Sequence, residues 1–271
     1  MGANDRPIRL MEPNEGIDPI AKKICEVFFE KSSSGWRYLE PNEFRVSQTA
    51  DCSWKLFFNK ILPQEEPQMG PIRFNEYNGL VTPHNGGALA GTFAHEKTQE
   101  LLKGFITDAE RKVTWEDNAK FVKISGHIDL EHQLNGKLSL TDIKTMAGYG
   151  FKSVVGEEYL QPGGYWDKKR RKSILTTNVY ANIVGTKYYN IMWMDRSDLR
   201  FKIEKFETDE TKFHEIHNKL VNVLNTVNSY KTGNTDAKPI PCGITMCNYC
   251  DHRNKVCPGS DLLARQSLNF D

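Results

Sequence analysis

The dipeptide Asn135-Gly136 constrains the fold of this chain more than any other feature, because it stands between two runs of alternating apolar and polar residues. Asn-Gly is the strongest short-range signal for the two-residue turn of a β-hairpin. The flanking runs, residues 121–130 and 138–145, therefore predict two antiparallel strands. Across such a turn, facing residues have numbers that sum to 271, which places Asp129 opposite Asp142.

This predicted pairing brings like charges together. Opposed residues share a face of the sheet, and Lys144, two residues beyond Asp142, projects to the same face. One interpretation is a solvated surface on which Lys144 offsets the two acids. The other is a divalent cation held by both carboxylates, because such a cation takes oxygen ligands and binds substrate phosphate. Lys144 would then orient or polarise the attacking water and balance charge at phosphorus.

The rest of the pattern predicts a mixed α/β core. Apolar residues recur at helical spacing in five segments, about 18–31, 48–62, 88–105, 173–184 and 208–230. Ser47 is a suitable N-cap for the second of these helices. Two further strands are expected at 188–194 and 201–206, whereas the proline-containing and glycine-containing segment 63–87 is expected to be a long loop.

Composition excludes several classes of protein. The 36 Lys and Arg residues balance 35 Asp and Glu residues, so the net charge of +1 gives no sign of a bulk polyelectrolyte. No apolar run approaches the roughly 18 residues of a membrane span, and the polar segment 1–14 lacks the pattern of a signal peptide. A cytoplasmic protein without membrane association is therefore expected. In a reducing compartment, clustered cysteines indicate metal binding or catalysis rather than disulfides.

Four of the six cysteines lie in the tail 236–260, spaced as Cys242-x4-Cys247-x2-Cys250-x6-Cys257. Thiolates at such short spacings converge on a metal without a hydrophobic core. A tetrahedral zinc site with four thiolate ligands and an iron–sulfur cluster both fit, and the spacing alone does not decide between them. Cys25, in the first predicted helix, is interpreted as a small buried hydrophobe.

Two segments around the hairpin carry a resemblance to a known family. The segment ending in Asp129 reads Gly-His-Ile-Asp and the segment after the turn reads Asp142-Ile-Lys144-Thr, which together resemble the PD-(D/E)XK nuclease signature in its RecB-type form. The resemblance implies a restriction-endonuclease-like core, a mixed central sheet flanked by helices. It also implies that Asp129, Asp142 and Lys144 form an active site that uses Mg²⁺ or Mn²⁺. The segment 91–95 matches the family's G-x-x-x-H pattern, which implies His95 as a further metal ligand.

The same branch carries a Q-x-x-x-Y motif on the helix after the lysine, and two positions compete for it. Gln161 and Tyr165 match the letters, but Pro and two Gly stand between them, which is a poor sequence for a helix. Tyr180 lies in the better helix, just before the strand 188–194, although Thr176 replaces the glutamine. We therefore expect Tyr180 to supply the tyrosine of the site.

Residues 47–58, which include Cys52, resemble the N-terminal cysteine helix of the iron–sulfur RecB-type nucleases, among them the CRISPR-associated and AddB-type enzymes. The resemblance implies a [4Fe–4S] cluster, with Zn²⁺ as the alternative, held by one early and three late cysteines: Cys52, Cys247, Cys250 and Cys257. Cys242 would be a spare or an alternative ligand. The cluster would join 47–62 to 236–260 and close a long loop. We expect an N-terminal arm and helix at 1–41 and a single nuclease domain at 42–271.

One block of positive charge is present, beside Tyr165 and Trp166, and consists of Lys168, Lys169, Arg170, Arg171 and Lys172. A solvated helix start is one interpretation. The other is a phosphate-tracking patch with aromatic stacking platforms, which suits single-stranded nucleic acid. Lys152 and an expected turn at 148–151 are candidates to extend this patch.

These features favour a metal-dependent deoxyribonuclease, most consistent with an exonuclease that hydrolyses phosphodiester bonds at single-stranded DNA ends in recombination, repair or spacer processing. One alternative is a nucleic-acid-binding or assembly module that keeps the fold and the cluster without useful catalysis. Another is a zinc-stabilised DNA-binding regulator. No G-x-x-x-x-G-K-[ST] motif is present, so a helicase partner, like a recombinase or integrase-type partner, would be another chain.

Overall fold

The structure is a computed structural model that describes residues 9–11, 38–62, 74–77, 80–83, 86–134, 136–156, 161–240, 250 and 252. Two compact units are present: residues 1–38 with 65–94, and residues 39–64 with 95–271. The predicted helix at 18–31 and Cys25 lie outside the described residues. The predicted domain boundary between residues 41 and 42 stays a prediction.

The first unit contains a three-stranded antiparallel sheet in the order β1-β3-β4, made of β1 (Arg9–Met11), β3 (Phe74–Tyr77) and β4 (Leu80–Pro83). The prediction of an unbroken loop at 63–87 is therefore wrong. Strands of four residues between prolines carry a weak periodic signal. In addition, β3 pairs with a strand that lies more than 60 residues earlier in the chain, which no local pattern reveals.

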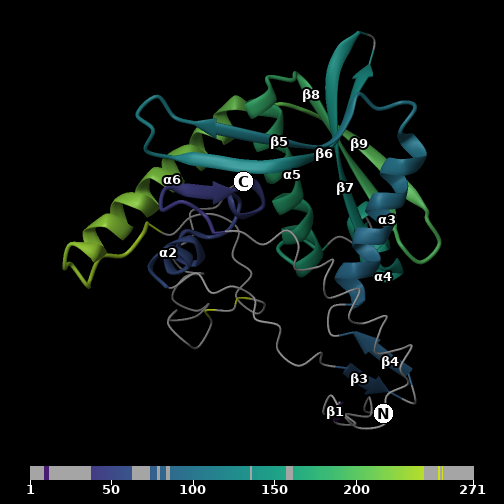
Figure 1. The fold of residues 1–271 in the computed structure, drawn as a ribbon, viewed down its shortest axis with the longest axis horizontal. Helices are drawn as coiled ribbons and strands as arrows, with labels where there is room; N and C mark the ends of the chain where they lie inside the picture. The colour runs from purple at the N-terminus through teal and green to yellow at the C-terminus, as the bar shows by residue number, and fades with distance from the viewer. Residues whose placement is uncertain are drawn as a thin grey trace. The chain divides into compact units, whose positions relative to one another are not determined.

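The second unit is built on a six-stranded mixed sheet (Figure 1). Its path is β2-β6-β7-β8-β9, and β5 pairs with β6. The pairs β2–β6 and β7–β8 are parallel and the others are antiparallel. The strands are β2 (Glu43–Arg45), β5 (Asp108–Glu116), β6 (Lys123–Leu134), β7 (Lys137–Met146), β8 (Tyr188–Asp195) and β9 (Phe201–Glu207). This is the mixed α/β sheet that the sequence predicts.

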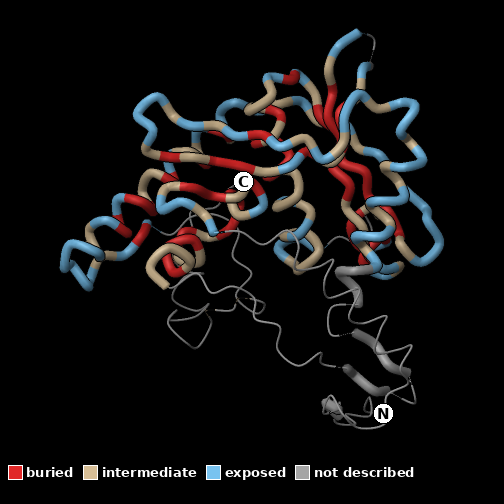
Figure 2. The backbone as a smooth tube through the Cα atoms, in the orientation of Figure 1, coloured by how far each residue is buried: buried red, intermediate tan, exposed pale blue. Residues whose placement is uncertain are grey.

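Helices cover this sheet and complete two hydrophobic clusters. They are the 3-10 turn η1 (Val46–Gln48), α2 (Ser53–Ile61), α4 (Gly148–Val155), α5 (Tyr165–Val184) and α6 (Glu210–Lys231). Helix α3 (Gly86–Leu102) begins in the first unit and ends in the second, and none of its described residues belongs to either cluster. One cluster joins β2, α2, β6, α5 and α6, and the other joins β6, β7, β8, α4 and α5. Figure 2 shows the buried residues running along the central strands and the helix faces against them. Helix α5 belongs to both clusters. No helix among the described residues has the length and apolar character to cross a membrane.

The structure corrects several expected boundaries. Helix α5 begins at Tyr165 rather than near 173, because the charged run is made of good helix formers even though it lacks apolar periodicity. Ser47 lies in η1, and Cys52 instead precedes the first turn of α2. The expected turn at 148–151 is the start of helix α4. Strand β5 was missed because its sequence, DAERKVTWE, is mostly polar.

Candidate active site

The hairpin positions the first carboxylates. The register of β6 with β7 runs from Leu134↔Lys137 to Leu130↔Thr141, which confirms the predicted two-residue turn. The regular pairing ends there, one residue before Asp129. Instead, the backbone N–H of Ile143 donates to Asp129 Oδ2 at 2.6 Å. The Asp129 side chain thus accepts a hydrogen bond from a backbone N–H of β7 at the point where the regular pairing of β6 with β7 ends.

A third acid, Glu110, lies on β5 next to Asp129 of β6. The register pairs Ala109 with Leu130 and Arg111 with Ile128, so Glu110 stands opposite Asp129, and regular pairing is interrupted there as well. Glu110 has a φ of 54°, in the left-handed region that residues other than glycine seldom adopt. Such conformations cost about 1–3 kcal/mol and gather at functional sites. Three adjacent strands therefore place Glu110, Asp129 and Asp142 side by side. We call these three residues the acid row.

Helix α3 adds a histidine to this row. His95 Nε2 lies 2.9 Å from Asp129 Oδ2, and Nδ1 lies 3.5 Å from Glu110 Oε1. One turn later, Gln99 Nε2 donates to Glu110 Oε1 at 2.7 Å and to the backbone oxygen of Asp129 at 3.1 Å. Ligand atoms of His95, Glu110 and Asp129 all lie within 4.8 Å of one another. The sequence pointed to His95, but nothing in it singled out Glu110 or Gln99.

The described hydrogen-bond partners of the Asp142 carboxylate all contact one of its oxygens, Oδ2. Asp142 is 6% exposed, and its Oδ2 lies 2.6 Å from Lys144 Nζ and 3.0 Å from the hydroxyl of Thr177 on α5. Its Oδ1 accepts no hydrogen bond from any described residue, and the same is true of Asp129 Oδ1. Each of the two predicted aspartates therefore keeps one carboxylate oxygen for another partner.

Burial and neighbouring charges shift the pKa values of Asp142 and Asp129 in opposite directions. Burial raises the pKa of Asp142 to about 6, the charge of Lys144 opposes this rise, and the charge of Asp129 adds to it. Burial also pushes the pKa of Asp129 upward, but hydrogen bonds from His95 and Ile143 and the charge of Lys144 outweigh it, so that this pKa is lowered. The two carboxyl groups thus differ in their tendency to ionise, which is typical of sites that use both.

The pKa values of the two basic groups of the site are both raised. Burial alone would lower the pKa of Lys144, but the charges of Asp142 and Asp129 outweigh it and the pKa is raised. For His95, burial is likewise outweighed by the hydrogen bond and charge of Asp129, which raise its pKa. Lys144 is therefore an ammonium group at neutral pH, able to donate hydrogen bonds but not to act as a base.

Tyr180 is the tyrosine that the structure brings to the carboxylates. A Cβ at Gly126 would lie 2.9 Å from a ring carbon of Tyr180, so the glycine of the G-x-x-D segment gives this ring room against β6. Burial raises the pKa of Tyr180, with the charges of Asp142 and Asp129 adding to it, so the phenol keeps its proton. Tyr165, in contrast, packs edge-on against Trp166 at a centroid distance of 4.8 Å, about four turns earlier on α5.

The five basic residues 168–172 do not form one continuous surface. Lys172 forms an ion pair with Asp51, and Arg170 Nη2 lies 2.9 Å from Glu204 Oε2. Lys169 Nζ lies 5.2 Å and 5.6 Å from the ring centroids of Tyr165 and Trp166. Within the part of the chain that the structure describes, Lys168 and Arg171 have no acidic partner. Contact of this run with DNA stays a prediction, which now rests on Lys168, Lys169 and Arg171.

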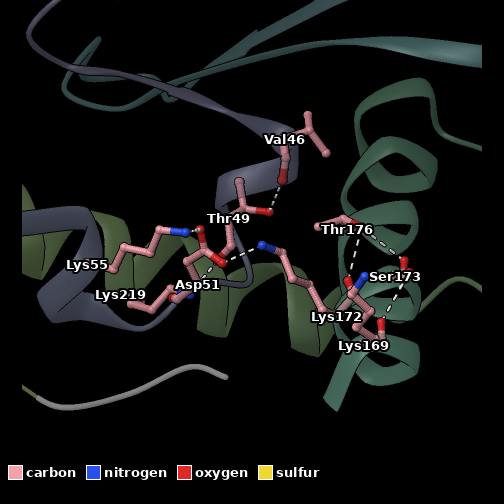
Figure 3. A network of polar contacts seen from close by, with 9 residues as sticks. All are labelled: Val46, Thr49, Asp51, Lys55, Lys169, Lys172, Ser173, Thr176 and Lys219. Carbon is pink, nitrogen blue, oxygen red and sulfur yellow. Dashed lines mark hydrogen bonds and ion pairs between the residues drawn. The ribbon is translucent and has the colours of Figure 1, made fainter. Parts of the chain in front are cut away.

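A second polar cluster surrounds Asp51, and Figure 3 shows lysines from three helices pointing toward it. Besides Lys172 of α5, Lys55 of α2 lies 3.4 Å from its carboxylate. The buried Lys219 of α6 donates to the backbone oxygens of Thr49 and Asp51, the latter at 2.9 Å. We call these contacts the Asp51 junction. It fixes the chain immediately before Cys52.

Two of the predicted cluster ligands are described. Cys52, at the start of α2, and Cys250 are both half-buried. His252, two residues after Cys250, lies 2.7 Å from Asn59 Oδ1 through its Nε2, and its ring is 5.6 Å from that of Phe58. This part of the tail therefore lies against the helix that Cys52 begins. Cys242, Cys247 and Cys257 lie outside the described residues, so the cluster stays a prediction.

Similar proteins are found among solved structures, whereas no family model and no curated protein matches the chain. SSO0001 is similar at a TM-score of 0.53 and 16% identity, over 89% of this chain and 97% of that one. An alkaline exonuclease from Laribacter hongkongensis gives a TM-score of 0.44 at 12% identity, over 78% and 96%. A phage-related exonuclease from Haemophilus somnus 129PT gives 0.37 at 9%, over 75% and 99%. Of these three, the first passes a TM-score of 0.5, and at 16% identity it supports the fold alone.

Proposed function

We propose that this protein is a metal-dependent DNA nuclease of the PD-(D/E)XK superfamily, RecB-type, which hydrolyses phosphodiester bonds. One observation carries the proposal: adjacent strands gather Glu110, Asp129 and Asp142 beside Lys144, and both aspartates keep an oxygen without a partner among the described residues. Like charges opposed in a sheet are destabilising. A divalent cation would remove that cost and give the site its chemistry.

The donor set suits Mg²⁺ or Mn²⁺. Carboxylate oxygens are the ligands that these hard cations prefer, and three of the four side chains are carboxylates. Asp129, Asp142 and His95 would hold the ion together with Glu110. Ligand atoms of His95, Glu110 and Asp129 lie within 4.8 Å of one another, whereas Asp142 lies outside that group and would approach the ion with its Oδ1. The cation would polarise the phosphoryl group and lower the pKa of a bound water.

The other side chains would act on the water and the phosphate. Because Lys144 is an ammonium group held by Asp142, it would orient the attacking water and balance charge at phosphorus as a hydrogen-bond donor. Tyr180, whose phenol stays protonated, would donate a hydrogen bond to the phosphate. This assigns catalytic roles to Asp129, Asp142, Lys144 and Tyr180.

The substrate would be single-stranded DNA, degraded from its ends by exonuclease action in recombination, repair or spacer processing. Support comes from α5, where the cations of Lys168, Lys169 and Arg171 stand beside the rings of Tyr165 and Trp166. Cations interleaved with aromatic rings bind single strands without strong sequence preference. A helicase, recombinase or integrase-type partner would be a separate chain in the cytoplasm.

The cysteines would hold a [4Fe–4S] cluster through Cys52, Cys247, Cys250 and Cys257. The contact of His252 with Asn59 supports this, because it brings the tail to the helix that Cys52 begins. Zinc in the same thiolate site is the alternative. Protein purified without oxygen should be brown, with absorbance at roughly 400 nm. Colourless protein that contains zinc would remove the cluster from the proposal.

The central experiment incubates the pure protein with end-labelled single-stranded DNA and Mn²⁺. Wild type should degrade the DNA, and Asp142→Ala and Lys144→Ala should each lower the rate by at least about 10³-fold. Asp198→Ala and Lys187→Ala, exposed acid and base at the surface of the same unit, should keep the wild-type rate. Undiminished activity in the first pair would refute the assignment of the site. DNA binding without degradation by wild type would favour the non-catalytic module.

A further inference from the structure

Two neighbouring threonines on α5 are both buried but have different partners. Among the described residues, Thr176 Oγ1 donates to backbone alone, to the oxygens of Lys172 and Ser173 at 3.0 Å each. Thr177 Oγ1 also lies near a backbone oxygen, that of Ser173, at 2.8 Å, but in addition lies 3.0 Å from Asp142 Oδ2. The side chain of Thr177 is completely buried, at 0% exposure. One of these threonines therefore reaches the acid row and the other does not.

The hydroxyl of Thr177 has one proton and two possible acceptors. A carboxylate accepts a stronger hydrogen bond than a neutral carbonyl, because the bond is charge-assisted. The single proton of Thr177 is therefore shared between Asp142 Oδ2 at 3.0 Å and Ser173 O at 2.8 Å, and the ionised Asp142 is the stronger acceptor. Thr176 shows that a buried threonine on this helix is satisfied by backbone alone. The contact with Asp142 is thus not required by the burial of a hydroxyl.

The contact selects one oxygen of the carboxylate. Thr177 and Lys144 both engage Oδ2 of Asp142, from a helix and from the strand itself, whereas Oδ1 has no hydrogen-bond partner among the described residues. Lys144 alone, at the end of a long flexible side chain, would not fix the plane of the carboxylate. A second donor on a rigid helix does so, because two fixed directions define the orientation of the group.

We propose that Thr177 is a positioning residue for the cation: its hydroxyl holds Asp142 Oδ2 toward α5 so that Oδ1 faces the ion. The inference rests on the proposed function, since it assumes that Asp142 is a metal ligand. Partners of this kind, which orient a ligand without touching the metal, typically change metal affinity or activity about 10–100-fold when they are removed. Nothing in the sequence pointed to this residue, because Tyr180 marks the helix but not which other residue reaches the strands.

The test measures Mn²⁺ binding directly, by the loss of the free-ion paramagnetic resonance signal, on the full chain without DNA. Thr177→Val keeps the shape and removes the hydroxyl, and it should weaken Mn²⁺ binding about 10-fold. Thr177→Ser keeps the hydroxyl and should remain within about threefold of wild type. Thr176→Val is the matched control and should bind as wild type does. In nuclease assays, Thr177→Val should need more Mn²⁺ for half-maximal rate and recover most of kcat at saturation.

The outcomes separate this inference from the proposed function. Equal Mn²⁺ binding by Thr177→Val and Thr176→Val would overturn the role of Thr177. If Asp142→Ala binds Mn²⁺ as tightly as wild type, the proposed metal site itself fails, whatever Thr177 does. If Thr177→Val does not fold, Thr177→Ala against Thr177→Ser gives the same comparison. Weak binding with Ala and normal binding with Ser would support the inference, and equal binding would overturn it.

Discussion

The Asp51 junction and the acid row are two polar clusters of one unit, and they differ in charge. Around Asp51, Lys55 and Lys172 supply positive charge to one carboxylate, and Lys219 satisfies backbone oxygens (Figure 3). In the row of Glu110, Asp129 and Asp142, three acids share one lysine and one histidine. The first cluster is satisfied by the protein itself, whereas the second has an excess of negative charge.

The difference separates a structural network from the proposed functional site. Burying a charge without a partner is costly, so folded proteins normally pair buried charges. The Asp51 junction follows that rule and joins α2, α5 and α6. In the acid row, Asp129 and Asp142 are paired with His95 and Lys144, Glu110 is half-exposed, and both sheet ladders are interrupted where Glu110 adopts a left-handed φ. Variants in the two clusters can test the contrast.

The largest effect is expected from Asp142→Asn. It removes one negative charge and one metal ligand but keeps the shape of the side chain, so nuclease activity should fall by at least about 10³-fold. Because ionised Asp142 is buried beside Asp129, the Tm of the metal-free protein should stay the same or rise. Calorimetry and the end-labelled DNA assay check both parts. A marked fall in Tm would place Asp142 with the structural network instead.

Lys219→Met should give the opposite result. It removes the buried ammonium that binds the oxygens of Thr49 and Asp51, so the free energy of unfolding should fall by about 2–3 kcal/mol. Activity per folded molecule should change little, because the junction lies outside the acid row. Urea denaturation measures the loss, and Lys231→Met, at the exposed end of the same helix, is the control. Unchanged stability would contradict the structural role.

The pH dependence of stability should distinguish wild type from Asp142→Asn without metal. The pKa of Asp142 is raised from 3.8 to about 6 in the folded protein, so the folded state binds more protons than the unfolded state between these values. This group therefore contributes stability below about pH 4 that is lost as pH rises to about 6. Urea midpoints across this range should show the loss in wild type only. Identical pH profiles for the two proteins would refute the prediction.

The smallest effect concerns α5 and salt. Lys169→Ala with Arg171→Ala should make the logarithm of single-stranded DNA affinity fall less steeply with the logarithm of salt concentration, by about 0.7 for each phosphate that the protein no longer neutralises. Lys172→Met should leave that slope unchanged and lower stability, because Lys172 is paired with Asp51. Fluorescence titrations at several salt concentrations check this. Equal slopes for wild type and the double variant would exclude Lys169 and Arg171 from the DNA path.

The candidate site could be predicted from sequence where it depends on neighbouring residues. The Asn-Gly signal predicted the register of the hairpin, which β6 and β7 confirm from Leu134↔Lys137 to Leu130↔Thr141, one residue short of Asp129 and Asp142. Glu110 could not be predicted from the sequence. Its position depends on the register of β5 with β6 and on its own left-handed φ within a mostly polar strand. The basic run 168–172 looked uniform in sequence, although two of its members bind acids far away in the chain.

The sequence by itself determined the hairpin and the mixed α/β class, because a two-residue turn and the alternation of a strand are local. Only the tertiary structure decided the rest. Thr177 meets Asp142 across 35 positions, and Lys172 meets Asp51 across 121. Such contacts depend on how α5 packs on the sheet and against η1 and α6. That packing follows from the shape of two hydrophobic clusters, which no single segment of the sequence contains.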